Sequence, residues 1–299
     1  MNSPAPSPIL CIGSVLWDVI GRSPAAMREG ADMPGRITRL PGGVALNIAM
    51  ALARHGLRPT LLSAVGRDPE GDELITACAG LGLVTDHIHR PEDLPTDRYM
   101  AVEAANGLVA AIADAHTLEA AGARILAPLV DGTLGDPGAP FGGIIALDGN
   151  LTTALLAEIA ESPAFAAADL RIAPASPGKA DRIARFLRHG RSTLYLNLEE
   201  AGLLCDTRFE SAETAARALL AKGAVRALVT DGARPAADAH RDGVLSLAPP
   251  EVAVARVTGA GDTFMAAHIA AETRGHPRDA AFHHALAAAA RYVSGETLH

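Results

Sequence analysis

Short apolar segments alternate with helix-forming segments along most of this 299-residue chain, and this alternation restricts its fold more than any other feature. Strands that alternate with helices pair in parallel, because each helix returns the chain to the edge where the next strand begins. The pattern predicts an α/β fold with a parallel sheet covered by helices. Strands are expected near 87–89, 124–128, 143–147, 170–173, 193–197 and 225–230, helices at 152–161, 179–188, from about 199, 211–222, 262–274 and 278–294, and a β ribbon at 234–256.

The composition indicates one soluble, cytoplasmic domain. Hydrophobic residues make up 49% of the chain, which suits a single elaborated domain over 9–299. A formal net charge of −8 argues against nucleic-acid polymers and anionic membranes as partners. No apolar run reaches the ~20 residues that span a bilayer. The three cysteines are odd in number and widely spaced, which favours free buried thiols, and the proline-rich residues 1–8 predict a disordered lead-in rather than a signal peptide.

Two separated segments predict a small β lid. Residues 96–105 and 108–113 have strand character and flank Asn106-Gly107, the favoured pair for a type I′ turn. An antiparallel hairpin does not belong inside a parallel sheet, so we expect 96–113 to join strands from 21–40 in a lid. A lid would keep water away from a reactive donor, whereas the alternative is a hairpin without function at the sheet edge.

The segment from Arg256 to Phe264 combines a glycine loop, an acidic residue and the start of an apolar helix. Free N–H groups and the helix dipole at such a helix start favour an anion, most naturally a phosphate. Gly259 and Gly261 would let the backbone approach that anion, and Asp262 would stand beside it. A carboxylate is useful there if it takes a proton from a hydroxyl that attacks the phosphoryl group. A helix merely capped by glycine and aspartate is the plainer interpretation.

A second glycine-led helix start lies in the amino-terminal half. Asn47 follows the Gly42-Gly43 pair by one helical turn, where asparagine is neither a strong helix former nor an obvious cap. Its side chain therefore points to a ligand or is simply exposed. Asp18 follows an apolar strand at 9–15, and open α/β sheets bind ligands at the carboxyl ends of their strands. A turn aspartate explains the same position equally well.

Two later strand ends also carry polar residues. Asn197 and Glu200 lie where a strand runs into a helix, a spacing that suits either water-mediated Mg²⁺ binding or an ordinary capping box. Thr230 and Gly232 end the next strand at a glycine turn.

Nearly the whole chain resembles the ribokinase-like (PfkB) family of carbohydrate and nucleoside kinases. Thr258–Phe264 is similar to the family's C-terminal signature, and Gly42, Gly43 and Asn47 to its N-terminal one. The resemblance implies a ribokinase-like α/β/α sandwich with a β lid, and dependence on ATP and Mg²⁺. We also expect a homodimer formed through the lid, and leave open a requirement for a monovalent cation such as K⁺.

The resemblance further implies roles for individual residues, which fall into base, anion hole, acceptor site, nucleotide site and metal site. The base is Asp262, and the anion hole is formed by Gly259, Ala260 and Gly261. The acceptor is bound by Asp18, Gly42, Gly43, Asn47 and Asp114, and the nucleotide by Asn197, Thr230, Gly232, Thr258, Gly259, Gly261, His284 and Ala287. Mg²⁺ is held through water by Glu200 and Asn197, since Mg²⁺ retains part of its hydration shell. Family members usually carry a second glycine soon after Gly232, where this chain has Ala233-Arg234-Pro235.

Within the family the chain resembles the pseudouridine kinases. Ala111–Ala115 is similar to their Ala-Ile-Asn-Asp-Met and Pro174–Lys179 to their Pro-Val-Ser-x-x-Lys, although Ala113 and Ala173 depart from the subfamily pattern. The sequence thus predicts ATP-dependent phosphorylation of the ribose 5′-hydroxyl of a nucleoside, preferably pseudouridine. A kinase of a free sugar (ribose, fructose or 2-keto-3-deoxygluconate) and a non-catalytic nucleoside-binding protein are the alternatives.

Overall fold

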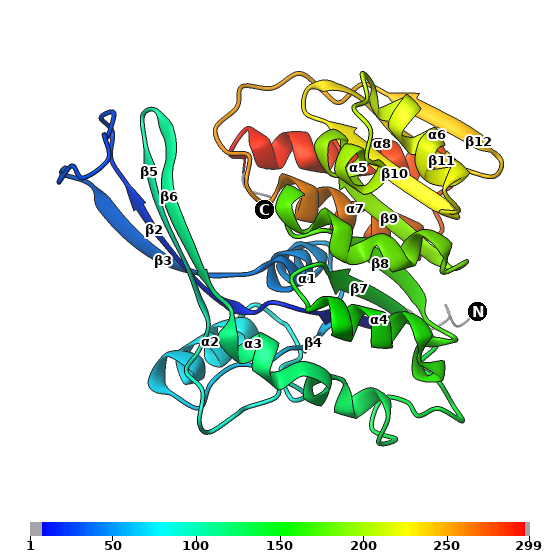
Figure 1. The fold of residues 1–299 in the computed structure, drawn as a ribbon, viewed down its shortest axis with the longest axis horizontal. Helices are drawn as coiled ribbons and strands as arrows, with labels where there is room; N and C mark the ends of the chain where they lie inside the picture. Colours follow the sequence, from blue (N-terminus) through cyan, green and yellow to red (C-terminus); the bar gives the residue numbers. More distant parts are fainter. Residues whose placement is uncertain (1–7, 297–299) are drawn as a thin grey trace.

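A computed structural model describes residues 8–296, so the predicted lead-in lies outside the described residues apart from Pro8. An eight-stranded main sheet forms the body, and a separate four-stranded sheet projects from it as the lid (Figure 1). In spatial order the main sheet contains β12 (Gly243–Leu247), β11 (Arg234–His240), β10 (Arg226–Asp231), β9 (Ser192–Asn197), β8 (Asp169–Ala173), β7 (Ile144–Asp148), β1 (Ile9–Ile12) and β4 (Thr60–Leu62). The strands from β10 to β4 run parallel, which confirms the predicted fold class.

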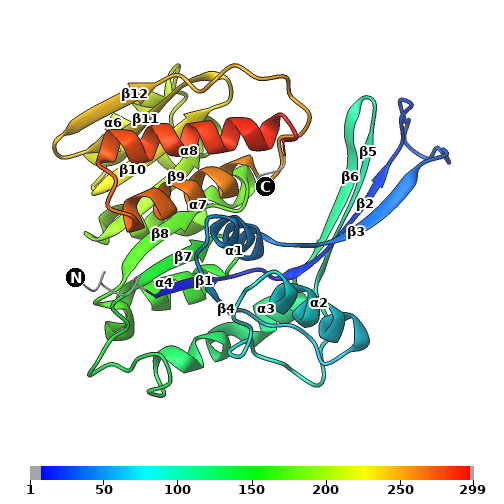
Figure 2. The same ribbon diagram turned by 180° about the vertical axis from the view of Figure 1, so that it is seen from behind.

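Helices cover both faces of the main sheet because its strands bury side chains on both sides. In β1, Leu10 and Ile12 join one core cluster and Ile9 and Cys11 the other, as the two-residue repeat of a strand requires. One face carries α1 (Val44–Arg54), α2 (Pro69–Gly80), α7 (Ala260–Thr273) and α8 (Arg278–Val293), of which Figure 2 shows α1, α7 and α8 in front of the sheet. The other carries α3 (His116–Ala121), η1 (Gly122–Leu129), α4 (Thr153–Glu161), η2 (Pro163–Phe165), η3 (Pro177–Arg188), α5 (Leu198–Cys205) and α6 (Ala212–Ala221).

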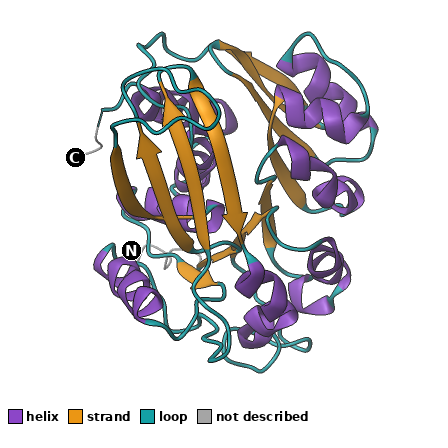
Figure 3. Cartoon of the chain, turned by 60° about the vertical axis from the view of Figure 1, so that its left-hand side comes forward, coloured by secondary structure: helices purple, strands orange, loops and turns teal. Residues whose placement is uncertain are grey.

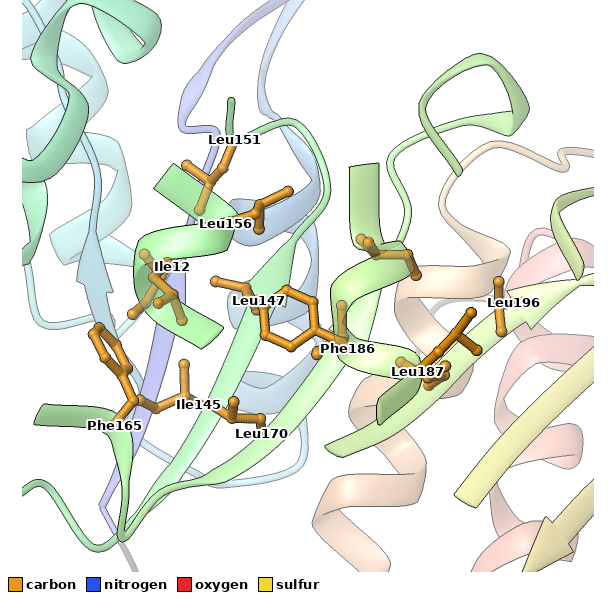
Figure 4. Packing of buried hydrophobic residues seen from close by; sticks show 14 of the residues in the cluster. Ile12, Ile145, Leu147, Leu151, Leu156, Phe165, Leu170, Phe186, Leu187 and Leu196 are labelled. Carbon is orange, nitrogen blue, oxygen red and sulfur yellow. The ribbon is translucent and has the colours of Figure 1, made fainter. Parts of the chain in front are cut away.

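The second of these faces is packed mainly by aliphatic and phenylalanine side chains. Figure 4 shows Ile145 and Leu147 of β7 facing Leu156 of α4 and the rings of Phe165 and Phe186. All three cysteines are buried and free, as predicted. None of the helices within residues 8–296 is long and apolar enough to cross a bilayer.

The lid sheet has the order β3 (Arg36–Gly42), β2 (Leu16–Arg22), β5 (Arg98–Ala104) and β6 (Gly107–Asp114), and Figure 3 shows its four strands from the broad side. Its base is held against α2, because Trp17 Nε1 donates to the carbonyl of Glu70 at 2.9 Å and Arg39 lies 4.3 Å above the Trp17 ring. The predicted discontinuous lid is therefore present, with strands that extend beyond the 21–40 and 96–113 limits.

Several local predictions were wrong for identifiable reasons. The 124–128 segment is part of the 3-10 helix η1, since Ile125, Leu126 and Leu129 bury one helical face. The 179–188 helix is likewise of the 3-10 type, and 87–89 contributes only an isolated bridge from His89. The ribbon expected to reach 256 ends at Leu247, just before Ala248-Pro249-Pro250, because proline cannot donate to a strand ladder.

The hairpin turn also differs from the prediction. A type I′ turn needs positive φ at both central residues, but within 8–296 Asp206 is the only non-glycine residue with positive φ, so Asn106 does not have it. Gly107 takes φ 98° instead, and the register shifts between Val102 and Glu103. The Asn106 side chain is used elsewhere, because it bonds both the N–H and the carbonyl of Met27 at 3.0 Å and so ties the hairpin tip to the β2–β3 loop.

Candidate active site

The glycine loop predicted to hold phosphate forms the start of α7. Gly259 has φ 88°, and an added Cβ would lie 2.5 Å from the hydroxyl of Tyr292, so only glycine fits there. A Cβ added to Gly261 would meet no atom within 4 Å, which leaves open space above the backbone of that residue. The Ala260 amide donates to the carbonyl of Val257 at 3.0 Å and is not free for an anion, whereas the amides of Gly259 and Gly261 have no partner among residues 8–296.

Asp262 follows this loop in the first turn of α7 and is partly buried. Burial is the main reason that its pKa is raised to about 7; the hydrogen bond from Asn47 opposes the rise, and the charges of Asp148, Glu200 and Asp18 add to it. A carboxyl group with a pKa near neutrality, beside free amides, has the properties of a general base for an attacking hydroxyl.

Asn47 connects the two halves of the sequence at this point. Its Nδ2 donates to Asp262 Oδ2 at 3.0 Å, across 215 positions of the chain. Asn47 lies in the first turn of α1, whose N-cap Gly43 has φ 98° and packs so closely on Ser14 that a Cβ would lie 2.5 Å from the Ser14 carbonyl. The predicted acceptor residues of α1 and the predicted base are therefore neighbours.

Asp18 belongs to the lid rather than to the turn after the first strand, which corrects its predicted position. It lies on β2 because β1 ends at Ile12 and the chain enters the lid sheet at Leu16. Its carboxylate still reaches the glycine pair, since a Cβ on Gly42 would lie 2.1 Å from Asp18 Oδ2. Burial raises the pKa of Asp18 to about 6.

Asp148, which the sequence analysis did not single out, connects the end of β7 to the segment around Ser14. Asp148, at the end of β7, is fully buried and accepts from the amide and the hydroxyl of Ser14 at 2.8 and 2.5 Å and from the Asn150 amide at 2.7 Å. The Ser14 hydroxyl in turn accepts from the Val44 amide at 2.9 Å. The available signal was an aspartate directly after a buried strand, but its pairing with Ser14 depends on β1 and β7 being neighbours.

Asn197 and Glu200 form the capping box that was the simpler of the two predicted alternatives. The Asn197 side chain accepts from the Glu200 amide and Glu200 Oε2 accepts from the Asn197 amide, both at 2.8 Å. Burial raises the pKa of Glu200 to about 7. Within the described part of the chain no three His, Cys, Asp or Glu side chains are grouped to hold a metal, so Mg²⁺ at this site would depend on nucleotide phosphates and water as well.

The other predicted nucleotide residues are divided between this edge and elsewhere. Thr230 is the register partner of Asn197 across β10 and β9, and Gly232 lies in the following turn with φ 59°. Arg234 belongs to the segment where family members usually carry a second glycine. Its side chain is largely exposed and pairs with Asp231 at 2.9 Å. Thr258 is exposed, and its carbonyl accepts from the Tyr292 hydroxyl at 2.8 Å.

Three further residues that were predicted for the site have neighbours outside this cluster. His284 packs against His55, with ring centroids 5.4 Å apart, at the end of α1 that lies about 12 Å along the helix from Asn47. Ala287 is one helical turn further along α8 and partly buried. Asp114 pairs with Arg98 in the row next to that of Asp18, so it lies on the opposite face of the lid, where it contacts His116 at 2.6 Å.

The family model of the pfkB family carbohydrate kinases matches residues 7–297 of the chain. The chain belongs to the PfkB family. Several of the curated proteins and solved structures that it matches are kinases by name.

The curated relatives of this PfkB chain do not share one named acceptor. The chain is 41% identical to pseudouridine kinase of Escherichia coli over 78 residues, which is 26% of this chain and 25% of that protein. It is 32% identical to the bifunctional protein HldE of Gluconacetobacter diazotrophicus over 94% of this chain and 59% of that protein. It is 28% identical to guanosine-inosine kinase of Exiguobacterium acetylicum over 87% and 85%. The matches thus span a quarter and about three fifths of the first two relatives.

Solved structures support the ribokinase-like fold. A carbohydrate kinase from Agrobacterium tumefaciens matches with a TM-score of 0.78 and 26% identity over 95% of this chain and 90% of that chain. Arabidopsis thaliana ribokinase, solved with ribose and ATP, matches with a TM-score of 0.75 and 20% identity over 97% and 93%.

Proposed function

We propose that this PfkB kinase transfers the γ-phosphoryl group of ATP to the ribose 5′-hydroxyl of a nucleoside, with pseudouridine as its preferred acceptor. The contact between Asn47 and Asp262 is the observation that carries the proposal, because it joins the acceptor half of the chain to a base that stands beside free backbone amides. The raised pKa of Asp262 supports the role of that residue as base at neutral pH.

The reaction then follows from the positions of these groups. The 5′-oxygen forms a bond to the γ-phosphorus while the bond from that phosphorus to the β,γ-bridging oxygen breaks, and ADP leaves. Asp262 takes the hydroxyl proton, and the free amides of Gly259 and Gly261 donate to the transferred phosphoryl oxygens. The Ala260 amide does not share this role, because it donates to Val257.

The donor side of the proposal involves ATP and Mg²⁺. Glu200 accepts a backbone bond through Oε2, and its Oε1 has no hydrogen-bond partner among the described residues, so this oxygen is the one we assign to Mg²⁺ or its water. When bound, Mg²⁺ would neutralise charge on the nucleotide phosphates. A requirement for K⁺ stays a prediction, and comparing initial rates in potassium and tetramethylammonium chloride at equal ionic strength tests it.

The choice of a nucleoside acceptor is supported by two kinds of likeness. The local motifs Ala111–Ala115 and Pro174–Lys179 resemble pseudouridine kinases, and two of the curated relatives above are nucleoside kinases by name. The family model that the chain matches is, by contrast, that of carbohydrate kinases, so an acceptor panel must include sugars.

The test is ADP release measured with equal concentrations of pseudouridine, uridine, inosine, ribose, fructose and 2-keto-3-deoxygluconate, followed by ³¹P NMR of the product. We expect the highest kcat/KM for pseudouridine and a phosphomonoester on its 5′-carbon. Faster turnover of a free sugar would contradict the proposed acceptor. Tight nucleoside binding without ADP release would instead identify a non-catalytic binding protein.

We also propose that the kinase forms a homodimer through the lid face opposite Asp18. Ile37, Met100 and Ile112 share that face by strand register and are 75%, 47% and 61% exposed, a grouping that a monomer rarely leaves in water. Light scattering should give twice the chain mass, and Ile112→Lys should give the monomer mass. A monomeric wild-type protein at micromolar concentration would contradict this part of the proposal.

A further inference from the structure

Lys179, in the first turn of η3, lies at the same edge of the main sheet as Ser14 and Asp148 but has no role in the proposed reaction. Its Nζ donates to Asn150 Oδ1 at 2.6 Å. The other two ammonium hydrogens have no hydrogen-bond partner in the described range 8–296, and the ammonium forms no ion pair there. A partly buried ammonium with a single neutral partner therefore has two donors left for a ligand.

Asn150 fixes the position of this ammonium. The Asn150 amide donates to Asp148 Oδ1 at 2.7 Å, and its Nδ2 donates to the Ser14 hydroxyl at 3.2 Å. The backbone bond holds the loop, and the bond from Nδ2 orients the side-chain amide so that its Oδ1 faces Lys179. Because the Ser14 hydroxyl also accepts from the Val44 amide, this network connects Lys179 to the glycine pair at the start of α1.

The neighbouring cation, Arg182, differs from Lys179 in the hydrogen bonds that it makes. Arg182 lies one turn further along η3 and donates through Nη1 to the carbonyls of Asn150 and Leu151 at 3.1 and 3.2 Å. Its charge is thus used to hold the loop after β7. Lys179 is held by one bond and remains free to bind.

The surroundings restrict what Lys179 can bind. It reaches the β7 and β1 end of the sheet, where the acceptor residues lie, whereas the proposed phosphate site is at α7 and the nucleotide residues follow β9 and β10. Burial lowers the pKa of Lys179, and Asp148 opposes that shift, so an acid lies near it. An anionic acceptor would also face Asp18, so a neutral oxygen acceptor is the better match.

We infer that Lys179, positioned by Asn150, binds a carbonyl oxygen on the base of the acceptor nucleoside and so selects bases that carry one. This inference rests on the proposed function and deepens it, because it assigns the part of the site that would distinguish pseudouridine from ribose. Lys179 is then a specificity residue that touches the substrate away from the reacting hydroxyl.

The test is Lys179→Met, which removes the charge and keeps the aliphatic stem. We expect the KM for pseudouridine to rise about 10- to 100-fold with kcat within twofold, and the KM for adenosine and ribose, which lack a base carbonyl, to stay unchanged. Isothermal titration with pseudouridine and with ribose, without nucleotide, should show the same selective loss of affinity. The matched control is Lys222→Met, at the exposed end of α6 and the only other lysine in the sequence.

The outcomes separate the two proposals. Wild-type turnover of pseudouridine tests the proposed function, whereas the ratio of pseudouridine to ribose affinity in the variant tests the inference. An equal loss for both ligands, an unchanged affinity for both, a fall in kcat alone, or a greater loss for 2-keto-3-deoxygluconate would each overturn it. Should Lys179→Met fail to fold by circular dichroism, Lys179→Gln is measured in the same way, with the same selective loss expected.

Discussion

Near the amino-terminal ends of β8 and β10 the buried charges are paired, whereas the buried and partly buried acids of the candidate site are not. Arg226 bonds Asp238 at 2.8 Å and Glu272 at 2.5 Å, and Arg171 also bonds Glu272 at 2.5 Å. Asp18, Asp148, Glu200 and Asp262 form no ion pair with any residue of 8–296. The helix α7 joins the two regions, with Asp262 in its first turn and Glu272 in its last.

The pKa values of the acids shift in opposite directions in these two regions. Burial alone would raise the pKa of Glu272, but His268, Arg171 and Arg226 lower it to about 2. At the other end of α7 no cation opposes burial, and the pKa of Asp262 is raised to about 7. Pairing with cations therefore keeps the buried acid Glu272 ionised, whereas burial without a paired cation makes Asp262 a proton acceptor near neutral pH.

The largest effect is expected from Asp262→Asn, because it removes the base. We expect kcat to fall by about 10³-fold or more, with nucleoside affinity by titration calorimetry nearly unchanged. Since the folded pKa of Asp262 lies above its unfolded value, its ionisation costs stability as pH rises toward 7, so the variant should be the more stable protein at pH 8. Retained turnover would show that the base is another group.

In the region where the buried charges are paired, we expect Asp238→Asn to reduce stability and to leave activity nearly unchanged. Asp238 is fully buried and bonds both Arg226 and Arg278, so we expect a loss of about 3–5 kcal/mol in the free energy of unfolding by urea, with kcat of the folded protein within twofold. Glu161→Gln, which breaks an exposed pair with Arg185, is the control and should change stability by less than about 1 kcal/mol. Equal effects of the two variants would remove the contrast between the regions.

A smaller, purely catalytic effect is expected from Gly261→Ala. A Cβ at this position meets no protein atom, so stability should not fall, but it would occupy the space predicted for the phosphoryl group. We expect kcat/KM for ATP to fall about 10²-fold. Gly80→Ala, which also meets no atom and lies at the exposed end of α2, should leave activity unchanged. An active Gly261→Ala enzyme would contradict the assigned anion site.

Asn47→Ala should give the smallest change in kcat at optimal pH, because Asn47 is assigned to acceptor binding and not to proton transfer. Its amide favours the charged form of Asp262, so its loss should move the acidic limb of the kcat/KM profile to higher pH. Because the substitution does not alter ATP, the shift also separates titration of the enzyme from titration of the nucleotide. An unmoved limb would indicate that Asn47 does not act on the base.

The sequence predicted what local patterns specify. Gly259, Gly261 and Asp262 lie at the start of an apolar helix, and Asn47 one turn into another, because glycine conformation and helical spacing are local properties. The features that it did not predict depend on which strands are neighbours. Asp148 becomes a bonding partner of Ser14 only because β7 lies beside β1, and the ion pairs of Glu272 require α7 to cross β8 and β10.

The strand faces of the lid residues could not be predicted for a related reason. The face on which Asp18 or Asp114 lies depends on strand register, and a shift of one residue reverses it, so proximity in the sequence to a motif does not place a side chain in the site. Gly13–Val15 is all that separates β1 from β2, too short a break for composition to mark the change of sheet.

The most direct test of an unpaired, buried base is the pH dependence of kcat/KM for the acceptor at saturating Mg²⁺ and ATP. The base acts only when deprotonated, so the rate should rise tenfold per pH unit below a midpoint near 7 and level off above it. A profile that stays flat from pH 5.5 to 8.5 would contradict the account.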